Sequence, residues 1–402
     1  MTVPHSAEHH SEHPSEPSAD DTGAIPTVND TARVPGEEPA EMPRRALILG
    51  ESAMALDLEQ AYKRLGFETR VGAARIAEEF RPGIIVTSGD AEDTIGDVEA
   101  AAERTGAVVA PNVAACRHTA DRMAVRRQAN EELGLPTLDY EFAQTPQEMQ
   151  DAIERIGYPC VVKAPTSNDG EGFSLVHSSA DLADAWREAD RGVGQGAVVE
   201  RFIDFDFEVT ILAARSIDPE TGQLATWFCE PIGTRHREGK LVEAWQPAPL
   251  PEGAMDNARS IAARITGALA SCGIFSVEMF VSGEDVYFSQ VTPRPSRDGL
   301  VTLVTQRVNQ FDLQARATQE LPIDSTLVSP GAVRFLPGRW PSQGALAAAL
   351  AVEETTVRTF GDGTLVLATA DSAGEARQRT DEAVREINRI DGKPDTPPTM
   401  EN

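Results

Sequence analysis

The sequence predicts a protein of mixed α/β and α+β class. We expect a small parallel-sheet domain at the N-terminus, a larger α+β domain in the centre and a small α/β domain at the C-terminus. Strands alternate with helices over residues 44–118, two β-rich apolar runs flank a short turn over residues 276–292, and short strands alternate with helices again over residues 325–395. The chain has 402 residues, which is long enough for two or three domains with a sizeable core.

The composition limits the kinds of partner that this chain can have. It carries 36 Lys and Arg against 64 Asp and Glu, a net charge of −28, and we find no local basic groove. Such a chain repels nucleic acid and anionic membranes, so we expect neither as a partner. No run approaches the roughly 18 apolar residues of a membrane span. With 41% hydrophobic and 25% charged residues, the composition is that of an ordinary globular protein.

The N-terminal segment and the cysteines indicate a cytoplasmic protein. Residues 1–43 are rich in Pro, Ser, Glu, Asp and His, and we expect a disordered acidic tail without a secretory signal. Its histidines form either a weak metal-binding patch or, as we favour, part of a solvated tail: His5, His9, His10 and His13. The four cysteines are scattered and fit reduced thiols: Cys116, Cys160, Cys229 and Cys272.

The first folded domain is expected over residues 44–118. Its pattern alternates strands with helices, which indicates a parallel sheet with helices on both faces. Its first turn, at residues 50–55, lacks the spaced glycines of a dinucleotide site, so we reject NAD and FAD. The expected strands are 44–50, 67–72, 82–89 and 107–111, and the expected helices are 55–66 and 91–106.

The central domain is expected over residues 119–320 and the C-terminal domain over residues 321–395, with a frayed end at 396–402. Amphipathic helices are predicted at 119–137, 145–159, 179–192 and 253–273, the second after a capping signal. Residues 225–249 are expected to be irregular. The expected strands are 160–165 and 175–178, then 197–203 and 206–216 as antiparallel strands, and finally 331–337, 357–361 and 364–370.

The hairpin at residues 276–292 carries two oxygen-bearing side chains, Glu278 and Gln290, in apolar surroundings. If its loop is the three residues 283–285, Ser282 pairs with Val286 and Glu278 lies opposite Gln290. Opposed Cβ atoms lie roughly 4.5–5.5 Å apart, close enough for both side chains to bind one cation. Mg²⁺ held with phosphates is one such cation. The alternative is an edge hairpin with both residues solvated.

Two further clusters point to a nucleotide. Lys163 ends a strand and is followed by a loop with Gly170 and Gly172, whose backbone amides can cover phosphates. The spacing is not that of a Walker loop, and a solvated turn is the alternative. Glu200 ends the next apolar strand and Glu208 begins another, so one carboxylate can accept from an adenine amino group and the other can bind ribose hydroxyls. An exposed acidic loop is the alternative here.

The order of these features resembles that of the ATP-grasp superfamily, in which two α+β lobes close on ATP. A helix with Arg122 precedes a strand ending in lysine, a glycine loop, a strand ending in glutamate and a hairpin with paired oxygens. The chain is most similar to the family of formate-dependent phosphoribosylglycinamide formyltransferases. The resemblance covers about residues 46–372, and its specific segments are IGYPCVVKAP, FDFEVTIL, EPIGTRHREGKLVEAWQP, FSVEMFVSGEDVYFSQVTPRP and DGLVTLVTQ.

This resemblance implies an enzyme in which ATP converts formate to formyl phosphate, which the amine of glycinamide ribonucleotide then attacks. It also implies a homodimer, Mg²⁺ bound by Glu278 and Gln290, and Arg294 as the residue that neutralises the transferred phosphoryl group. ATP would be bound by Arg122, Lys163, Asn168, Asp169, Gly170, Glu171, Gly172, Phe173, Glu200, Arg201, Phe202, Ile203 and Glu208.

The sequence departs from the family pattern at the metal and the phosphates. Family members carry glutamate at both metal positions, whereas this chain has Gln290 at the second. An amide oxygen can bind Mg²⁺ but brings no charge. Glu171 stands where a lysine is expected. Each like-charge contact with a phosphate at about 4 Å costs on the order of 1 kcal/mol even in bulk water.

Larger departures lie on the ribotide side. Two family glutamates align with Ala53 and Ser88, and a family aspartate aligns with Arg297, beside Asp298. The family's basic cluster for the ribotide phosphate should fall between residues 360 and 365, where this chain reads GDGT. We therefore expect ATP binding, while the substrate-binding residues stay unassigned. The alternatives are an ATP-grasp ligase that joins another carboxylate to another amine, and an ATP-binding paralogue without turnover.

Overall fold

The computed structural model describes residues 44–89, 94–166, 172–192, 194–237 and 239–392, and these residues form three sheets. The mixed α/β and α+β class predicted from the sequence is confirmed. The predicted acidic tail at 1–43, the predicted frayed end at 396–402 and four predicted ATP-binding residues fall outside the described residues: Asn168, Asp169, Gly170 and Glu171.

The N-terminal sheet has four parallel strands in the order β2-β1-β3-β4, as predicted. The side chains of β1 alternate between two cores. Ile48 packs with α1 on one face, whereas Leu47 packs with α2 and α3 on the other. The elements are β1 (Arg45–Leu49), α1 (Ala53–Arg64), β2 (Glu68–Gly72), η1 (Ala74–Ile76), α2 (Ala77–Phe80), β3 (Ile84–Thr87), α3 (Ile95–Thr105) and β4 (Val108–Ala110).

The second sheet is antiparallel, with four strands in the order β5-β8-β6-β7, and we call it the small-lobe sheet. Helices α6 and α7 pack on it through a core that includes Met149 and Ile153. Thr145 caps α6 by accepting from the Glu148 amide, which confirms the predicted capping signal. The elements are β5 (Tyr140–Ala143), α6 (Pro146–Ile156), β6 (Cys160–Lys163), β7 (Phe173–Val176), η3 (Ser179–Asp181), α7 (Leu182–Asp190) and β8 (Ala197–Arg201).

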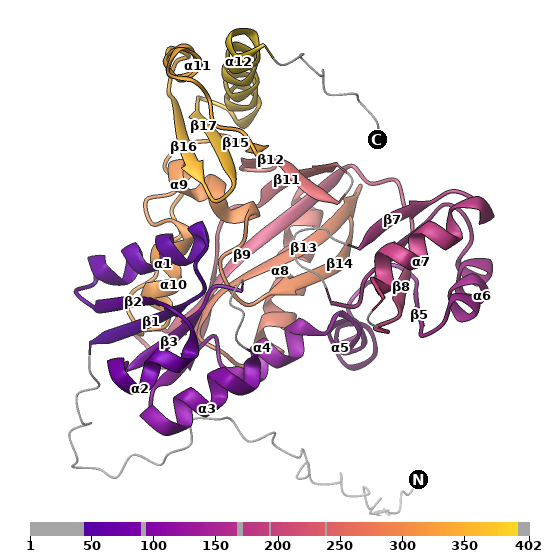
Figure 1. Ribbon diagram of the computed structural model, residues 1–402, viewed down its shortest axis with the longest axis horizontal. Coiled ribbons are helices and arrows are strands. Elements are labelled where there is room, and N and C mark those ends of the chain that lie inside the picture. The colour runs from indigo at the N-terminus through magenta and orange to yellow at the C-terminus, as the bar shows by residue number, and fades with distance from the viewer. Residues whose placement is uncertain (1–43, 90–93, 167–171, 193, 238, 393–402) are drawn as a thin grey trace, which may run out of the picture. The chain divides into compact units, whose positions relative to one another are not determined.

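The third sheet is the largest and runs from the hairpin to the C-terminal strands (Figure 1), in the order β14-β13-β9-β11-β12-β15-β17-β16, with β10 paired to β9. Helix α8 covers β9, β13 and β14 through a common apolar core. The elements are β9 (Phe207–Ile217), β10 (Leu224–Phe228), β11 (Ile232–Arg237), β12 (Lys240–Gln246), α8 (Glu252–Ala268), β13 (Gly273–Ser282), β14 (Asp285–Thr292), β15 (Gly331–Pro337), β16 (Thr355–Phe360) and β17 (Gly363–Thr369).

The predicted helix at 119–137 is wrong in its extent. Asp121 caps a new helix by accepting from two amides, and a π-helical turn ends the segment at Glu132, before the Gly-Leu-Pro sequence. The remaining helices are α4 (Val113–Ala120), α5 (Arg122–Arg127), η2 (Gln128–Glu132), η4 (Asp298–Val301), α9 (Thr302–Thr305), α10 (Gln310–Ala317), α11 (Gln343–Ala349) and α12 (Ala373–Asp391). None of the helices among the described residues is long and apolar enough to cross a membrane.

Two further expectations about strands are corrected. Residues 225–249, expected to be irregular, contain β10, β11 and β12. The buried charge of Glu243 hid β12, because its partners are Arg235 on the neighbouring strand β11 and Arg377 on the distant helix α12. The predicted strands at 197–203 and 206–216 do not pair with each other. They become β8 and β9, which lie in different sheets.

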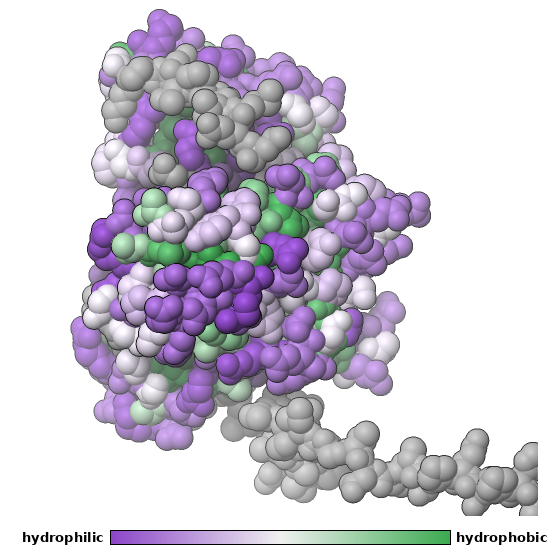
Figure 2. All heavy atoms as spheres, turned by 90° about the vertical axis from the view of Figure 1, so that its right-hand side faces the viewer, coloured by the Kyte–Doolittle hydropathy of each residue, from purple (hydrophilic) through white to green (hydrophobic). Residues whose placement is uncertain are grey.

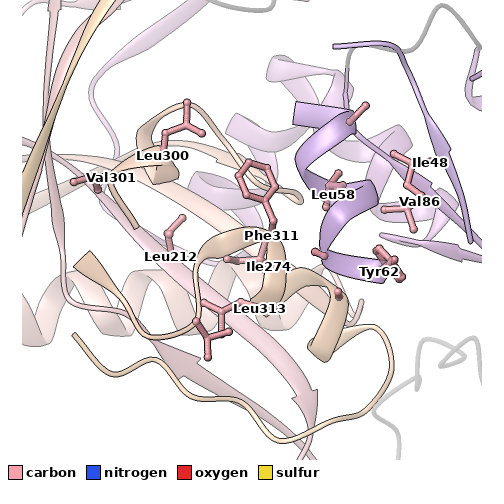
Figure 3. Close-up of a cluster of buried hydrophobic side chains, with 14 of the residues drawn as sticks. Ile48, Leu58, Tyr62, Val86, Leu212, Ile274, Leu300, Val301, Phe311 and Leu313 are labelled. Atoms are coloured by element: carbon pink, nitrogen blue, oxygen red, sulfur yellow. The ribbon is translucent and has the colours of Figure 1, made fainter. Parts of the chain in front are cut away.

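An apolar core joins the N-terminal sheet to the large sheet. Figure 3 shows Phe311 and Ile274 facing Leu58 and Tyr62 of α1. The Tyr62 hydroxyl is 2.7 Å from Thr318 Oγ1, which satisfies its polar end. Figure 2 shows the side of the molecule that lies on the right in Figure 1. This side is mostly hydrophilic, with a band of hydrophobic residues across it.

Candidate active site

A small pocket brings together four of the residues singled out in the sequence. Arg122, Lys163, Glu200 and Gln290 all line it. They come from α5, β6, β8 and β14, so two different sheets contribute to one pocket. The other lining residues are Thr119, Val125, Arg126, Val198 and Ser289.

Glu200 is bonded through both of its carboxylate oxygens and is only 3% exposed. Its Oε2 atom accepts from Lys163 Nζ at 2.6 Å, and its Oε1 atom accepts from Arg126 Nη2. Burial alone would raise the pKa of Glu200, but Arg126 and Lys163 lower it to about 2. Glu200 is therefore ionised, and both of its oxygens already bind protein cations.

Arg126 is a pocket residue that the sequence analysis missed. It lies four residues after Arg122, and its guanidinium also donates from Nη1 to the Phe288 carbonyl oxygen at 2.8 Å. It is 6% exposed. The i, i+4 spacing to Arg122 places both residues on one face of α5. This spacing is the one feature of the sequence from which Arg126 could have been placed near the same site.

The hairpin of β13 and β14 places Glu278 directly opposite Gln290, as predicted. The predicted three-residue loop is wrong, however. Ser282 pairs with Asp285 across a two-residue turn, and the ladder shifts by one residue between Glu278 and Met279. Gly283 has φ +60°, as the first central residue of a type II′ turn requires. The shift is a β-bulge at Ser289, which restores the opposition that the shorter turn would have removed.

Glu278 lies among several charged groups. Burial and the nearby Asp298 raise its pKa to about 7, although His236 and Arg122 act in the opposite direction. Asp298 is 7% exposed and accepts from Thr210 Oγ1 at 2.7 Å. A bound cation would favour the ionised form of Glu278, so this environment fits a metal ligand.

The donor set also fits magnesium in part. Glu278 supplies a carboxylate and Gln290 an amide oxygen, and Mg²⁺ usually binds one or two carboxylates together with phosphates and water. Among the residues that the structure describes, no three His, Cys, Asp or Glu side chains form a group that could hold a metal by themselves. Substrate phosphates would have to complete the coordination.

Glu208 lies beside a histidine that the sequence analysis also missed. His236 Nδ1 is 2.8 Å from Glu208 Oε2, and the two residues belong to the neighbouring strands β11 and β9. Burial alone would lower the pKa of His236, but the bond to Glu208 and the charges of Asp298 and Glu278 raise it to about 9. At neutral pH His236 is therefore an imidazolium beside the Glu208 side chain.

Of the predicted phosphate-covering loop at residues 168–173, the structure describes only Gly172 and Phe173. Gly172 has φ +71°, and a Cβ there would lie 2.6 Å from the Ala164 Cβ, so the close approach of the two strand ends requires glycine. Phe173 begins β7 and pairs with Lys163. In the hinge, Arg201 pairs with Asp139 at 2.8 Å on the surface, and its backbone N–H donates to the Asp139 carbonyl oxygen at 2.9 Å. Phe202 and Ile203 are partly buried.

Arg294 lies against the N-terminal sheet. A Cβ on Gly89 would come within 1.8 Å of Arg294 Nε, so the side chain crosses directly over this glycine. Burial raises the pKa of Cys116, while its bond to Thr87 and the charge of Arg294 act against that rise. Arg294 is therefore placed between the N-terminal strands and the hairpin that ends at Thr292.

The structure also describes the surroundings of three positions at which the sequence departs from the family pattern. Ser88 is buried and donates its hydroxyl hydrogen to the Leu49 carbonyl oxygen at 2.5 Å. Ala53 begins α1. Strands β16 and β17 are joined by the two-residue turn Gly361–Asp362, which carries no basic side chain.

Comparison with known proteins gives consistent results. The ATP-grasp domain family matches residues 128–311. The formate-dependent phosphoribosylglycinamide formyltransferase of Corynebacterium efficiens is 45% identical over 348 residues, covering 79% of this chain and 87% of that protein. The protein of the same name from Paraburkholderia xenovorans is 38% identical over 395 residues, covering 88% of this chain and 97% of that protein.

Comparison with solved structures agrees with the family match. Glycinamide-RNase-transformylase T from Mycobacterium tuberculosis has a TM-score of 0.72 at 31% identity, covering 86% of this chain and 100% of that chain. Carboxyaminoimidazole ribonucleotide synthase from Aspergillus clavatus, solved with ATP, has a TM-score of 0.75 at 18% identity, covering 87% and 99%, and shows the shared fold alone. The resemblance found in the sequence is thus confirmed: this chain is an ATP-grasp enzyme that belongs to the family of formate-dependent phosphoribosylglycinamide formyltransferases.

Proposed function

We propose that this enzyme uses ATP and Mg²⁺ to convert formate to formyl phosphate and then transfers the formyl group to the amine of glycinamide ribonucleotide. In the first step a formate oxygen attacks the γ-phosphorus, the bond to the β–γ bridging oxygen breaks, and ADP leaves. In the second step the amine attacks the formyl carbon and inorganic phosphate leaves, with loss of one proton from nitrogen. The curated relatives carry this activity in their name.

The roles of the residues follow from their positions. Lys163 and Arg122 would bind ATP phosphates, and Glu208 would accept from ribose hydroxyls. The backbone of Glu200–Ile203 would meet the adenine edge, and the amides of Asn168–Phe173 would cover the phosphates. When bound, Mg²⁺ would offset phosphate charge next to Glu278 and Gln290, and Arg294 would stabilise the charge of the transferred phosphoryl group. Positioning and electrostatics then supply the catalysis, and the protein needs no nucleophile.

The observation that carries this proposal is the convergence of Arg122, Lys163, Glu200 and Gln290 on one pocket. Lys163 and Arg122 bring positive charge to a chain of net charge −28. Cationic side chains are the usual partners of phosphate, and Gln290 stands opposite Glu278 in the adjacent hairpin.

A second candidate function is favoured by the ribotide side of the site. Ala53 brings no polar group, the Ser88 hydroxyl is bonded to Leu49, and the Gly361–Asp362 turn has no cation to meet a phosphate monoester. These features favour an ATP-grasp ligase that joins a different carboxylate to a different amine through the same acyl phosphate. A paralogue that binds ATP without turnover is the remaining alternative.

A direct assay separates these functions. Purified enzyme is incubated with formate, ATP, Mg²⁺ and glycinamide ribonucleotide, and both ADP and formylated product are measured, with Lys163→Met as the inactive control. Formylated product from the wild type but not from the control supports the proposal. ADP release driven only by another acid–amine pair supports the ligase. Nucleotide binding without ADP release under any pair supports the paralogue.

We also propose a cytoplasmic homodimer in which residues 44–118, 119–320 and 321–395 act as three domains around this site. The scattered cysteines and the family resemblance support this proposal. Light scattering should then give twice the chain mass of 43.2 kDa, and a monomer mass would contradict the dimer.

A further inference from the structure

A single buried arginine connects the two sheets that form the candidate active site. Arg126 donates from Nη1 to the carbonyl oxygen of Phe288 on β14, which belongs to the large sheet. Its Nη2 atom donates to Glu200 on β8, which belongs to the small-lobe sheet. The two bonds use two nitrogens of one planar guanidinium, so they fix the two strands at a defined mutual position.

The connection continues to the residues that would bind the nucleotide. The other oxygen of Glu200 accepts from Lys163 at 2.6 Å, so Arg126, Glu200 and Lys163 form one charged chain. Their side chains are 7%, 5% and 16% exposed, respectively. Removing one partner from ion pairs that are so well shielded from water is strongly unfavourable, because it leaves an uncompensated buried charge.

The other end of the connection is the β-bulge. Phe288 immediately precedes Ser289, the extra residue that places Gln290 opposite Glu278. In a regular ladder continued from the Ser282–Asp285 pair, Ser289 would occupy that place. Arg126 therefore anchors the strand just before the irregularity on which the Glu278–Gln290 pair depends.

We propose that Arg126 is a positioning residue that couples nucleotide binding in the small lobe to metal binding at the hairpin. It acts through Glu200 and Lys163 on one side and through the backbone of Phe288 on the other. Small-lobe residues and the Glu278–Gln290 pair must meet the same ATP phosphates and their Mg²⁺, so a rigid link between them makes each site favour the other. This inference rests on the proposed function in that it assumes ATP as the ligand.

The test compares Arg126→Met with a matched control, Arg127→Met. Arg127 lies on the same helix, but it is exposed and its guanidinium stacks on Phe142 at 5.2 Å instead of joining the two sheets. Affinity for AMP-PNP is measured by calorimetry with and without Mg²⁺, well below the melting temperature of each variant. For Arg126→Met we expect affinity with Mg²⁺ to fall by about tenfold or more, and the gain that Mg²⁺ gives the wild type to shrink. Arg127→Met should keep both wild-type values within about twofold.

Arg126→Lys serves if the methionine variant does not fold. Its ammonium keeps the charge but lacks the planar fork, so it should keep most of the nucleotide affinity while losing the gain from Mg²⁺. In a folded Arg126 variant, unchanged affinity and an unchanged gain from Mg²⁺ overturn the coupling, whatever the melting temperature. If the wild type itself binds no nucleotide, the proposed function fails instead, and the two failures are thereby distinguished.

Discussion

At the scale of single residues, Gln290 is the position where this chain differs most informatively from a two-glutamate metal site. Its amide stands opposite Glu278, whose pKa burial and Asp298 raise to about 7. The pair would therefore bring at most one negative charge to a divalent cation bound there. Because hard cations favour carboxylates, the metal affinity of this pair should be limited by residue 290.

The first prediction concerns Gln290→Glu. A second carboxylate should lower the Mg²⁺ concentration for half-maximal ATPase by about three- to tenfold, because it adds charge at a position already facing Glu278. The measurement is steady-state ATPase against Mg²⁺ concentration. Gln290→Met, which removes the oxygen but keeps the length, should raise that concentration. No gain from the glutamate would count against a metal role for residue 290.

The second prediction concerns the pH dependence of stability at His236. Its pKa is about 9 in the folded protein against 6.5 when unperturbed, because Glu208, Asp298 and Glu278 outweigh the effect of burial. The folded state therefore holds this proton more tightly than the unfolded state. The resulting stabilisation is fully present below the unfolded pKa and is lost as the pH rises through about 9.

We expect His236→Gln to lower the free energy of unfolding by on the order of 1–3 kcal/mol at about pH 6 and to have little effect at about pH 10. Urea unfolding at both pH values measures this. His177→Gln, at an exposed histidine after β7, is the matched control and should show no such dependence. An equal loss at both pH values would contradict the ion pair.

At the scale of elements, the hairpin shows that a correct contact can follow from an incorrect turn. A three-residue loop and a two-residue turn with a bulge give the same opposition of Glu278 and Gln290. Turn length is readable from sequence when glycine and polar residues mark it, but a bulge depends on how both neighbouring strands pack. The bulge at Ser289 also lies next to the carbonyl that Arg126 binds.

Helix α12 is held on the large sheet by charge as well as by apolar contacts. Arg377 donates to both oxygens of Glu243 at 2.9 and 3.0 Å and lies 4.0 Å above the Trp245 ring. Glu243 is 1% exposed and also pairs with Arg235. This buried carboxylate on β12 needs its cations, since an uncompensated buried charge is strongly destabilising.

The third prediction is that Arg377→Met lowers the free energy of unfolding by about 1–3 kcal/mol, because Glu243 keeps only one cation and the stacking on Trp245 is lost. Arg389→Met on the same helix is the control. Arg389 is exposed and pairs only locally with Glu386, so about 0.5 kcal/mol or less is expected. Chemical denaturation of both variants measures their free energies of unfolding. An equal loss of free energy in the two variants would argue against the role of Glu243.

At the scale of the whole molecule, the N-terminal sheet contributes to the position of Arg294. Gly89 has φ +91° and lies directly beneath the Arg294 side chain. Arg358 on β16 also binds Asp57 of α1 through both carboxylate oxygens, at 2.5 and 2.6 Å. The first helix of the described chain and strand β16 are thus tied together by a charged contact in addition to the apolar core that they share.

The fourth prediction is that Gly89→Ala lowers kcat by about tenfold or more while ATP affinity stays within about twofold, because the new methyl group displaces Arg294 but not Lys163 or Arg122. Gly106→Ala is the control. Gly106 has φ +75°, with no heavy atom within 4 Å of its would-be Cβ, so it carries similar backbone strain without a neighbour. Full activity of Gly89→Ala would show that Arg294 needs no support from the N-terminal sheet.

Several features could be determined from the sequence by itself. Local patterns predicted the parallel N-terminal sheet, the capped helix α6 and the alternating β13–β14 hairpin, because burial on one or both faces imposes a period that local residues reveal. The order of Lys163, Glu200 and Glu278 along the chain was enough to indicate the ATP-grasp superfamily, and the longer segments around them indicated the family. Gly172 was singled out as part of a glycine loop, and its φ of +71° and its close contact with Ala164 show that the backbone requires glycine there.

Only the tertiary structure decided which of these residues meet. Arg126 and His236 acquire their importance from partners 74 and 28 positions away. The i, i+4 spacing of Arg126 to Arg122 places it on the same helix face but does not reveal its partner Glu200.

The buried Glu243 helped to hide strand β12, because its charge is neutralised by Arg377, which lies 134 positions further along the chain. A pattern of hydrophobic and polar residues records burial, but the pairing of buried charges is fixed by the packing of distant segments. The candidate active site contains such pairs, at Arg126–Glu200 and at Lys163–Glu200.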